Sequence, residues 1–433
     1  MTNDAIRAAD DVGAPLRIAV LCPHFEPDTA PTGAVMTRIV HELAGRGHEL
    51  HVVTALPWYR DHAIDPAWRG RWIRRQATEW GSITRVHPFP GDDRRNLVRR
   101  GLGFAGFGAL ALCCGVRGGR ADAVIAMSPP LTNGPIGWLM RLARRAPLVF
   151  NIQDVFPDAA IETGAITNAT VIAAARRLER FAYRRSDAIT VLSDDLRDNV
   201  VAKLPARLAD RVHVIPNFVL TDEIRPLARS TRYRHELGIG DEPVVLYAGN
   251  VGFSQSLDLI VAAAQALPDV TFLVNGEGSA KADLVETARG LANVRFAPYQ
   301  PASRLPEVLA TGDIHVVPLR AGLGRVSVPS KTYSILAAGR PVLAAIDPGT
   351  EVPRLLAASG GGVAVPPDDP EAFIAALRDL VADPEGAAEM GRQGRAWVER
   401  SASPAAVAGE YERLIVELLA RRSPRQGIGR ARR

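Results

Sequence analysis

A lysine at the expected start of a helix is the first group in this chain that could do chemistry. Within residues 328–342, Ser330 suits an N-cap, Gly339 suits a left-handed residue after the helix, and Pro341 prevents continuation. The first N–H groups of a helix lack intrahelical partners and carry partial positive charge, to which Lys331 adds a full charge. Ser330 and Lys331 therefore predict an anion site, and a phosphate suits such a site.

Two glycine-containing turns lie between an expected strand and an expected helix in the same half of the chain. One spans residues 249–256 and the other spans residues 275–279. Glycine lets backbone N–H groups approach a diphosphate closely, although similar turns close many α/β units that bind no ligand. Together with Lys331 at the same expected sheet edge, the two turns predict a convergent nucleotide pocket.

Asp154 is the acidic residue in the first half of the chain that draws attention. It follows an expected buried strand at residues 148–153, and an acid at such a strand end can face a ligand. It could bind a sugar hydroxyl or stabilise positive charge at an anomeric carbon, or it could be a turn or N-cap aspartate. We interpret His24 as a loop histidine rather than a base, and His315 as structural.

Several enzyme classes are disfavoured by what the loops contain. The loop at residues 22–33 is not G-x-G-x-x-G, and the second strand ends in Thr54 and Ala55 rather than an acid, so a nicotinamide-dependent dehydrogenase does not fit. No His, Cys and Asp cluster has metal-ligand spacing, and there is no G-x-S-x-G. We therefore expect neither a metal nor a cofactor.

The composition is that of a soluble globular protein of two domains. The chain has 433 residues, 47% of them hydrophobic and 23% charged, and its net charge of +5 is too small to indicate nucleic acid as a partner. Three cysteines cannot form a disulfide framework, and the polar N-terminus does not resemble a signal peptide. We therefore expect a cytoplasmic location.

The apolar run at residues 101–116 has two interpretations. It is shorter than the roughly 20 residues that span a bilayer. It could be a glycine-rich core helix. It could also be a membrane-surface segment, in which the arginines that precede it make residues 94–116 a contact for anionic lipid headgroups.

Strand-like and helix-like segments alternate along the chain, which predicts βαβ units and parallel sheets. The first series ends near Asn217, and the polar residues 221–240 are interpreted as a linker. The fold class predicted is α/β, with two successive Rossmann-like, doubly wound parallel-sheet domains. Their predicted bounds are residues 15–218 and 219–402, followed by a final helix at 403–421 and a basic tail at 422–433 that we expect to be disordered.

The motifs, taken in order, resemble the retaining glycosyltransferases of family 4. The segments that carry the resemblance are the loop with Gly33, residues 46–54, 153–158, 214–217, 249–256, 276–278 and 329–342. Residues 153–158 are similar to the Q-D-L-W-P-E stretch of a bacterial subgroup that builds exopolysaccharide, capsule or O-antigen. The resemblance covers nearly the whole chain, and it implies the GT-B architecture, in which the two domains face each other across a cleft.

The family implies transfer of a sugar, with retained configuration, from a nucleotide-diphosphate donor, expected to be a UDP-sugar. The acceptor would be a lipid-linked saccharide or an oligosaccharide, and the enzyme would act at the inner face of the cell membrane. No metal would be required. By this resemblance Asp154 is catalytic, Thr32 and Gly33 are on the acceptor side, and the final helix packs on the first domain. The donor-binding positions so implied are Asn250, Gly252, Gln255, Glu277, Tyr299, Arg325, Ser330, Lys331 and Thr332.

The chain departs from the family pattern at several positions. The two glutamates that the broad family carries seven residues apart are Val326 and Ser334 here, and the usual Arg and Lys of the diphosphate loop are Asn250 and Gln255. The frequent histidine before Asp154 is a glutamine. Two other functions stay open: a UDP-sugar epimerase of the same architecture, and a sugar-nucleotide-binding scaffold without turnover.

Overall fold

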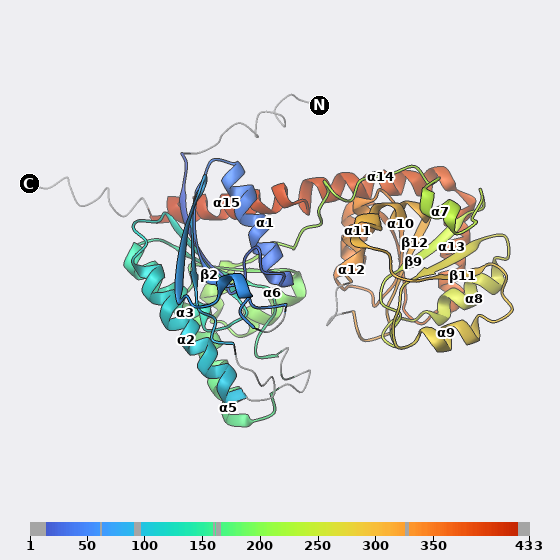
Figure 1. Cartoon of the computed structure of the whole chain (residues 1–433). Coiled ribbons are helices and arrows are strands. Elements are labelled where there is room, and N and C mark those ends of the chain that lie inside the picture. The colour runs from blue at the N-terminus through green and yellow to red at the C-terminus, as the bar shows by residue number, and fades with distance from the viewer. Residues whose placement is uncertain are drawn as a thin grey trace, which may run out of the picture. The chain divides into compact units, whose positions relative to one another are not determined.

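The computed structural model describes residues 14–60, 63–90, 97–158, 161, 166–324 and 329–422, apart from the side chains of residues 97–102 and 104. The chain forms two compact units (Figure 1). One consists of Met1–Asn217 together with Val407–Arg433, and the other of Phe218–Ala406. The basic tail from residue 423 onward lies outside the described residues.

The first unit is built on an eight-stranded sheet with the order β3-β4-β2-β1-β5-β6-β7-β8. The β3 and β4 strands pair antiparallel, and the other neighbours are parallel. Its elements are β1 (Arg17–Leu21), α1 (Pro31–Gly45), β2 (Glu49–Ala55), β3 (Ile73–Thr78), β4 (Gly81–Val86), α2 (Leu97–Val116), β5 (Ala123–Ser128), α3 (Asn133–Arg144), β6 (Leu148–Ile152), α5 (Ala169–Arg185), β7 (Ala188–Val191), α6 (Asp194–Ala202) and β8 (Val212–Val214).

The second unit is built on a six-stranded parallel sheet with the order β11-β10-β9-β12-β13-β14. Its elements are α7 (Arg232–Glu236), β9 (Val244–Ala248), α8 (Asp258–Ala266), β10 (Thr271–Asn275), α9 (Lys281–Thr287), β11 (Val294–Ala297), α10 (Leu305–Thr311), β12 (Ile314–Pro318), α11 (Lys331–Ala337), β13 (Val342–Ala345), α12 (Glu351–Ser359), β14 (Gly362–Val365), α13 (Pro370–Ala382) and α14 (Pro384–Ser401). The last helix, α15, spans Pro404–Arg422.

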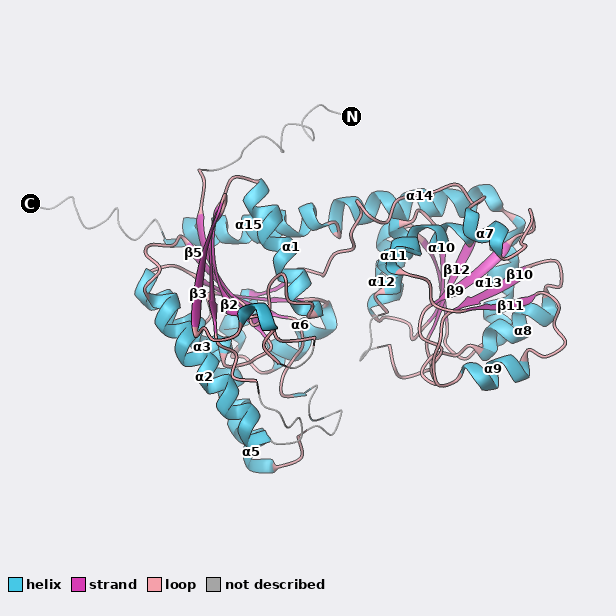
Figure 2. Cartoon of the chain, viewed as in Figure 1, coloured by secondary structure: helices cyan, strands magenta, loops and turns pink. Residues whose placement is uncertain are grey.

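Helices cover both faces of the second sheet (Figure 2). Strand β13, for example, is apolar and buried at every position. Leu343 and Ala345 join the core under α8 and α13, whereas Val342 and Ala344 join the core under α11 and α12. Successive side chains of a strand point to opposite faces, so a strand covered on both sides must be apolar at every position.

The strand order places the ligand-binding edges. It reverses between β1 and β5 in the first unit and between β9 and β12 in the second. In doubly wound sheets, ligands bind at the carboxyl ends of the strands beside such a reversal. These two edges are therefore the places where a functional site is expected in each unit.

The linker predicted at residues 221–240 is wrong in part. The segment contains helix α7, and Tyr233 and Ile239 are buried in a core cluster of the second unit. The side chain of Arg234 is buried with them and donates to the carbonyl oxygens of Gly240 and Thr311 at 2.9 and 3.0 Å. The polar composition of the segment did not reveal its buried residues. An arginine counts as polar in composition even when it is buried and donates hydrogen bonds to backbone carbonyl oxygens.

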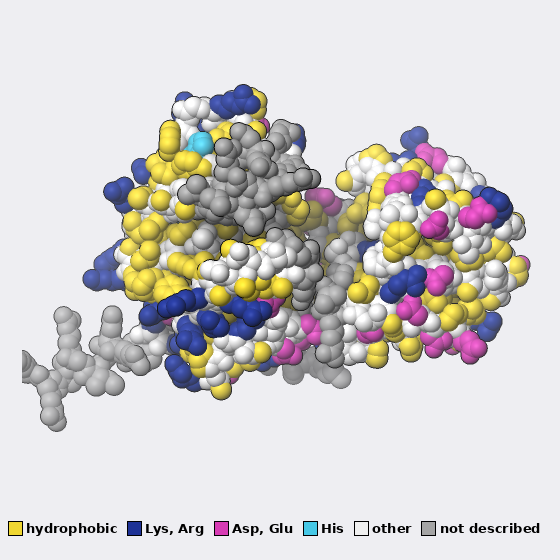
Figure 3. All heavy atoms as spheres, turned by 90° about the horizontal axis from the view of Figure 1, so that it is seen from below, with side chains coloured by type: hydrophobic (Ala, Val, Ile, Leu, Met, Phe, Trp, Pro, Cys, Tyr) yellow, Lys and Arg dark blue, Asp and Glu magenta, His cyan; other side chains and the backbone are white. Residues whose placement is uncertain are grey.

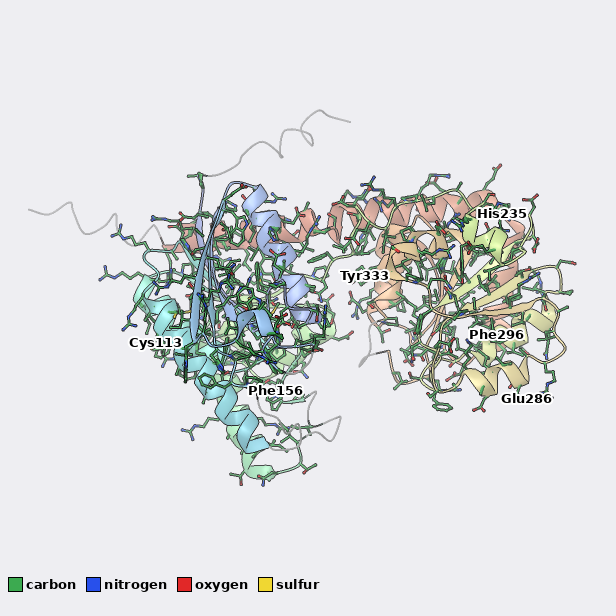
Figure 4. The ribbon with its side chains drawn as sticks, in the orientation of Figure 1. Cys113, Phe156, His235, Glu286, Phe296 and Tyr333 are labelled. Carbon is green, nitrogen blue, oxygen red and sulfur yellow. The ribbon has the colours of Figure 1, made fainter. Side chains whose placement is uncertain are left out.

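The described side chains of helix α2 support the core interpretation of residues 101–116 for one face of the helix. Phe107, Ala111 and Cys114 are buried in the core of the first unit, and a Cβ on Gly115 would lie 2.7 Å from the Met140 sulfur of α3. Cys113, by contrast, is exposed (Figure 4). The absence of a side chain on Gly115 therefore lets α2 and α3 pack closely. Residues 94–96 lie outside the described part of the chain.

Residues 407–422 of helix α15 belong to the first unit, although the strands of that unit end near residue 214. The Tyr411 hydroxyl is buried and accepts a 2.7 Å hydrogen bond from Asn151 Nδ2 of β6. Glu412 pairs with Arg46 at 3.0 Å and with His48 at 3.1 Å. The helix is thus fixed to the sheet by a buried hydrogen bond and to the end of α1 by charge.

Candidate functional site

The second unit contains a pocket of about 560 Å³ at the carboxyl ends of its strands. Ala248, Asn275 and Pro318, which end β9, β10 and β12, all line it. This is the edge at which the strand order reverses. The pocket is lined by Ala248, Gly249, Asn250, Gln255, Asn275, Tyr299, Gln300, Ala302, Leu305, Val308, Leu309, Val317, Pro318, Leu319, Pro329, Ser330, Lys331 and Ser334.

Lys331 is the one charged side chain among the described residues that line this pocket. Its Nζ lies 3.9 Å from the centre of the Tyr247 ring, and no described residue gives it a hydrogen bond or a carboxylate partner. Burial lowers the pKa of Lys331 from 10.5 to about 8. An ammonium that faces a pocket without a counter-ion is favourably placed to bind an anion, which would supply the missing charge.

Gly249 is needed for the position of that ammonium. Its φ is +145°, and a Cβ there would lie 2.6 Å from Lys331 Nζ. A side chain at residue 249 would therefore strain the backbone and displace the charge. The turn after β9 thus contributes the space that the lysine occupies.

The glycines of the second turn allow the two turns to approach each other closely. A Cβ on Gly276 would lie 1.8 Å from the Gly249 carbonyl oxygen, and one on Gly278 would lie 2.2 Å from the Val251 carbonyl oxygen. The Val251 N–H also donates to the Glu277 carbonyl oxygen at 2.9 Å. These glycines therefore let the two turns pack backbone against backbone.

The predicted donor-binding residues of these turns separate into two groups. Asn250 and Gln255 line the pocket, but Gly252 and Glu277 do not. The Gly252 N–H already donates to Gln255 Oε1 at 3.0 Å, so in this structure it is not available to a phosphate. Glu277 forms a 2.6 Å surface ion pair with Lys281.

Helix α11 also differs from its expected form. It has only seven residues, and Ser330 is its N-cap residue as predicted, although the Ser330 side chain makes no capping hydrogen bond. Its end matches the prediction, because Gly339 has a φ of +68° and the Arg340 N–H donates to the Ile335 carbonyl at 3.2 Å. The evidence for an anion site therefore comes mainly from the charge of the Lys331 ammonium, and less from the N-terminus of this short helix.

The remaining predicted donor residues are placed as follows. Ser330 and Tyr299 line the pocket, and Tyr299 is 54% exposed. Thr332 is fully buried beside Lys331 and does not line it. Arg325 lies outside the described residues. Ser334, which replaces the family's glutamate, does line the pocket, and no carboxylate stands among the described lining residues.

In the first unit, Asp154 lies two residues after the end of β6 and is exposed. No described residue bonds to its carboxylate. Its neighbour Gln153 is buried and held at both ends, donating to Asn151 Oδ1 and accepting from Asn217 Nδ2, each at 3.0 Å. Gln153 thus fixes the strand end from which Asp154 projects.

Thr32 and Gly33, predicted on the acceptor side, lie in the first turn of α1. Gly33 is buried, and a Cβ on it would lie 2.7 Å from His24 Cβ. That contact draws attention to His24, which sequence reasoning dismissed. Its Nδ1 lies 2.7 Å from Asp28 Oδ2, and the i, i+4 spacing in a loop gave no recognisable signal for this pair.

No group of three or more His, Cys, Asp or Glu side chains in the described ranges could hold a metal ion. No helix within the same ranges is both long and apolar enough to cross a membrane.

Comparison with protein families gives two successive matches along the chain. Residues 32–217 match the model described as "Glycosyl transferase 4-like domain", and residues 242–383 match the model described as "Glycosyl transferases group 1". The first match falls in the first unit and the second in the second unit.

Two curated relatives extend over most of the chain. A protein of Escherichia coli K12 described as a colanic acid biosynthesis glycosyl transferase, WcaI, is 29% identical over 86% of this chain and 93% of its own length. A Pseudomonas aeruginosa protein described as a glycosyltransferase, WbjE, is 28% identical over 67% of this chain and 74% of its own length.

Solved structures share the fold at low sequence identity. Sucrose-phosphate synthase from Thermosynechococcus elongatus aligns with a TM-score of 0.65 at 17% identity, over 94% of this chain and 100% of that one. The Anabaena protein HepE in complex with UDP aligns with a TM-score of 0.63 at 13% identity, over 93% of this chain and 100% of that one.

Proposed function

Because the chain belongs to glycosyltransferase family 4 and has the GT-B fold, we propose that it transfers a sugar from a UDP-sugar to a lipid-linked saccharide, with retention of configuration, in surface-polysaccharide biosynthesis. The observation that carries the donor assignment is the pocket of the second unit, whose described lining contains one cation, Lys331, and no carboxylate. The presence of UDP in the HepE structure and the description of WcaI support the nucleotide and the pathway.

The proposed mechanism needs charge at two places. As the bond from the anomeric carbon to the diphosphate breaks, negative charge grows on the leaving UDP, and Lys331 stabilises it. Positive charge grows on the sugar, and Asp154 stabilises that. The acceptor oxygen forms the new bond on the same face of the sugar, and its proton passes to the leaving diphosphate. Lys331 supplies the countercharge, so we propose no metal requirement.

UDP binding should depend on pH through Lys331. The free protein holds this group with a pKa of about 8, and only its protonated form attracts the diphosphate. Affinity should therefore be greatest below pH 8 and fall as the pH rises through 8, by up to about tenfold per unit, until the pKa of the complex is reached. Calorimetry in buffers of different ionisation enthalpy should show proton uptake near pH 8. Constant affinity from pH 7 to 9.5 would exclude Lys331 as the diphosphate ligand.

We also propose that the first unit works on the cytoplasmic face of the cell membrane. Hydrophobic and Lys or Arg side chains gather on the face of this unit that Figure 3 shows. Leu139 and Leu142 of α3 are 37% and 51% exposed, and α3 packs against α2. Exposed apolar side chains with nearby cations suit an anionic lipid surface.

Vesicle sedimentation tests this membrane proposal. The protein should bind phosphatidylglycerol vesicles at low salt and should not bind vesicles of phosphatidylcholine alone. Ala105→Glu with Ala109→Glu, on the exposed side of α2, should weaken binding at least tenfold without unfolding the protein. Equal binding to both vesicle types, or no effect of the two glutamates, would contradict the proposal.

A further inference from the structure

The loop after β1 holds a histidine whose imidazole is oriented by a buried carboxylate. Asp28 Oδ2 lies 2.7 Å from His24 Nδ1, and Asp28 Oδ1 accepts from the backbone N–H groups of Thr29 and Tyr59 at 3.0 and 3.1 Å. Burial alone would raise the pKa of Asp28, but the hydrogen bond and charge of His24 and these N–H groups outweigh it and lower the pKa. Asp28 is thus an ionised acceptor, so Nδ1 of His24 carries the hydrogen.

The imidazole is fixed by packing as well as by this hydrogen bond. Its ring stacks on Trp58 with centroids 5.6 Å apart and meets Tyr59 edge-on at 5.3 Å. The absence of a side chain on Gly33 lets α1 approach from behind, since a Cβ there would lie 2.7 Å from His24 Cβ. The His24 side chain is 12% exposed and that of Asp28 only 3%. Such multiple restraint is typical of a group held ready for a ligand.

The other ring nitrogen is the free end of this arrangement. No described residue bonds to His24 Nε2, and this atom is not one of the buried polar atoms that lack a partner, so it reaches solvent. With the hydrogen on Nδ1, Nε2 of the neutral ring is an acceptor. His24 follows β1, which borders the reversal of strand order in the first unit, so Nε2 lies at the edge where ligands of such sheets bind.

We propose that His24 Nε2 accepts a hydrogen bond from a hydroxyl of the saccharide acceptor, with Asp28 as the residue that positions the ring. Tyr59, 39% exposed, offers an aromatic face on which the apolar side of a sugar ring can pack. This inference rests on the proposed glycosyl transfer and adds the residues that recognise the acceptor. An imidazole acceptor beside an aromatic ring selects a sugar hydroxyl rather than a phosphate.

A second histidine–carboxylate pair, which joins Glu26 of this loop to His41 of α1, serves as a control. His41 Nε2 lies 2.7 Å from Glu26 Oε1, but these side chains are 40% and 50% exposed. The Glu26–His41 pair therefore has the distance of the Asp28–His24 pair without its burial. Exposed pairs of this kind contribute little to stability, so substitutions in it should be nearly silent.

The test compares His24→Phe, which keeps a ring against Trp58 and loses both nitrogens, with His24→Gln, which keeps a polar end. His24→Phe should raise KM for a polyprenyl-diphosphate monosaccharide at least tenfold and leave the Kd for UDP within twofold. His24→Gln should recover part of the loss, Asp28→Asn should fall between, and His41→Phe should match the wild type. An unchanged acceptor KM in His24→Phe, or an equal loss of UDP affinity, would overturn the inference.

Binding of the same polyprenyl-diphosphate monosaccharide in detergent, without donor, separates this inference from the proposed function. A tenfold weaker Kd in His24→Phe than in the wild type supports it even if no sugar is transferred, in which case only the proposed function fails. Equal Kd values, or no acceptor binding by the wild type, overturn it. If His24→Phe lowers Tm by more than a few degrees, the His24→Gln comparison with His41→Gln decides.

Discussion

Replacing Lys331 by methionine should weaken UDP binding by about 30- to 150-fold, which is about 2–3 kcal/mol, the range for a hydrogen bond between charged groups. The reason is that the described lining of the pocket offers no second cation to replace it. Isothermal titration of the full chain with UDP measures the change. An affinity within threefold of the wild type would show that the diphosphate does not bind at this lysine.

The same substitution should make the unliganded protein more stable. The pKa of Lys331 is lowered on folding from 10.5 to about 8, so the penalty for its charge is fully present below pH 8 and disappears as the pH rises through 10.5. Methionine has a similar shape and no charge, and at pH 7 it should raise the free energy of unfolding by about 1–3 kcal/mol. Lys281→Met is the control, because Lys281 is paired with Glu277 on the surface and should change neither quantity. Lower stability of Lys331→Met would mean that the lysine is structural.

Asp154→Asn should lower kcat by about 100-fold or more while leaving the Kd for UDP within twofold and Tm nearly unchanged. The carboxylate is exposed and bonds to no described residue, so its loss should not disturb folding. Removing a charge aimed at the transition state typically costs two or more powers of ten in rate. Equal losses of turnover and UDP affinity would indicate that Asp154 acts in binding alone.

Asp158→Asn is the matched control for that experiment. Burial raises the pKa of Asp158, but hydrogen bonds from Lys203 and Asn199 outweigh it and hold the pKa below its ordinary value. The distances are 2.6 Å to Lys203 and 3.2 Å to Asn199. This variant should therefore lose stability, by about 1 kcal/mol, with little change in kcat per folded molecule.

The sequence predicted the fold well because buried parallel strands are apolar at every position. The apolar residues 244–248 predict a strand, and β9 has these bounds; the apolar run 341–346 predicts another, and β13 is one residue shorter at each end. The hairpin of β3 and β4 was missed, because β3 alternates between exposed and half-buried residues and carries adjacent arginines. The helix-like pattern of residues 37–46 predicts a start at Thr37, but α1 begins six residues earlier, at Pro31, although proline at a first helical position is a usable signal.

The sequence predicted those parts of the site whose chemistry depends on a single residue, such as Lys331. It did not predict the parts that depend on contacts between residues of different loops. The place of Lys331 at the start of an expected helix predicted its position in a pocket. The hydrogen bond from the Gly252 N–H to Gln255, by contrast, depends on side-chain geometry that sequence spacing does not contain. The His24–Asp28 pair was missed for the same reason. Two polar residues four apart in a loop become a unit only when backbone groups from another strand end hold the carboxylate.

The most direct test of the account is to incubate the full chain with a panel of UDP-sugars and a polyprenyl-diphosphate monosaccharide, and to determine the product by NMR. We predict release of UDP in equal amount to a new glycoside whose anomeric configuration is that of the donor. UDP binding with no glycoside across the panel would indicate a scaffold, and conversion of the donor to its epimer would indicate an epimerase. Either result would contradict the proposed transfer.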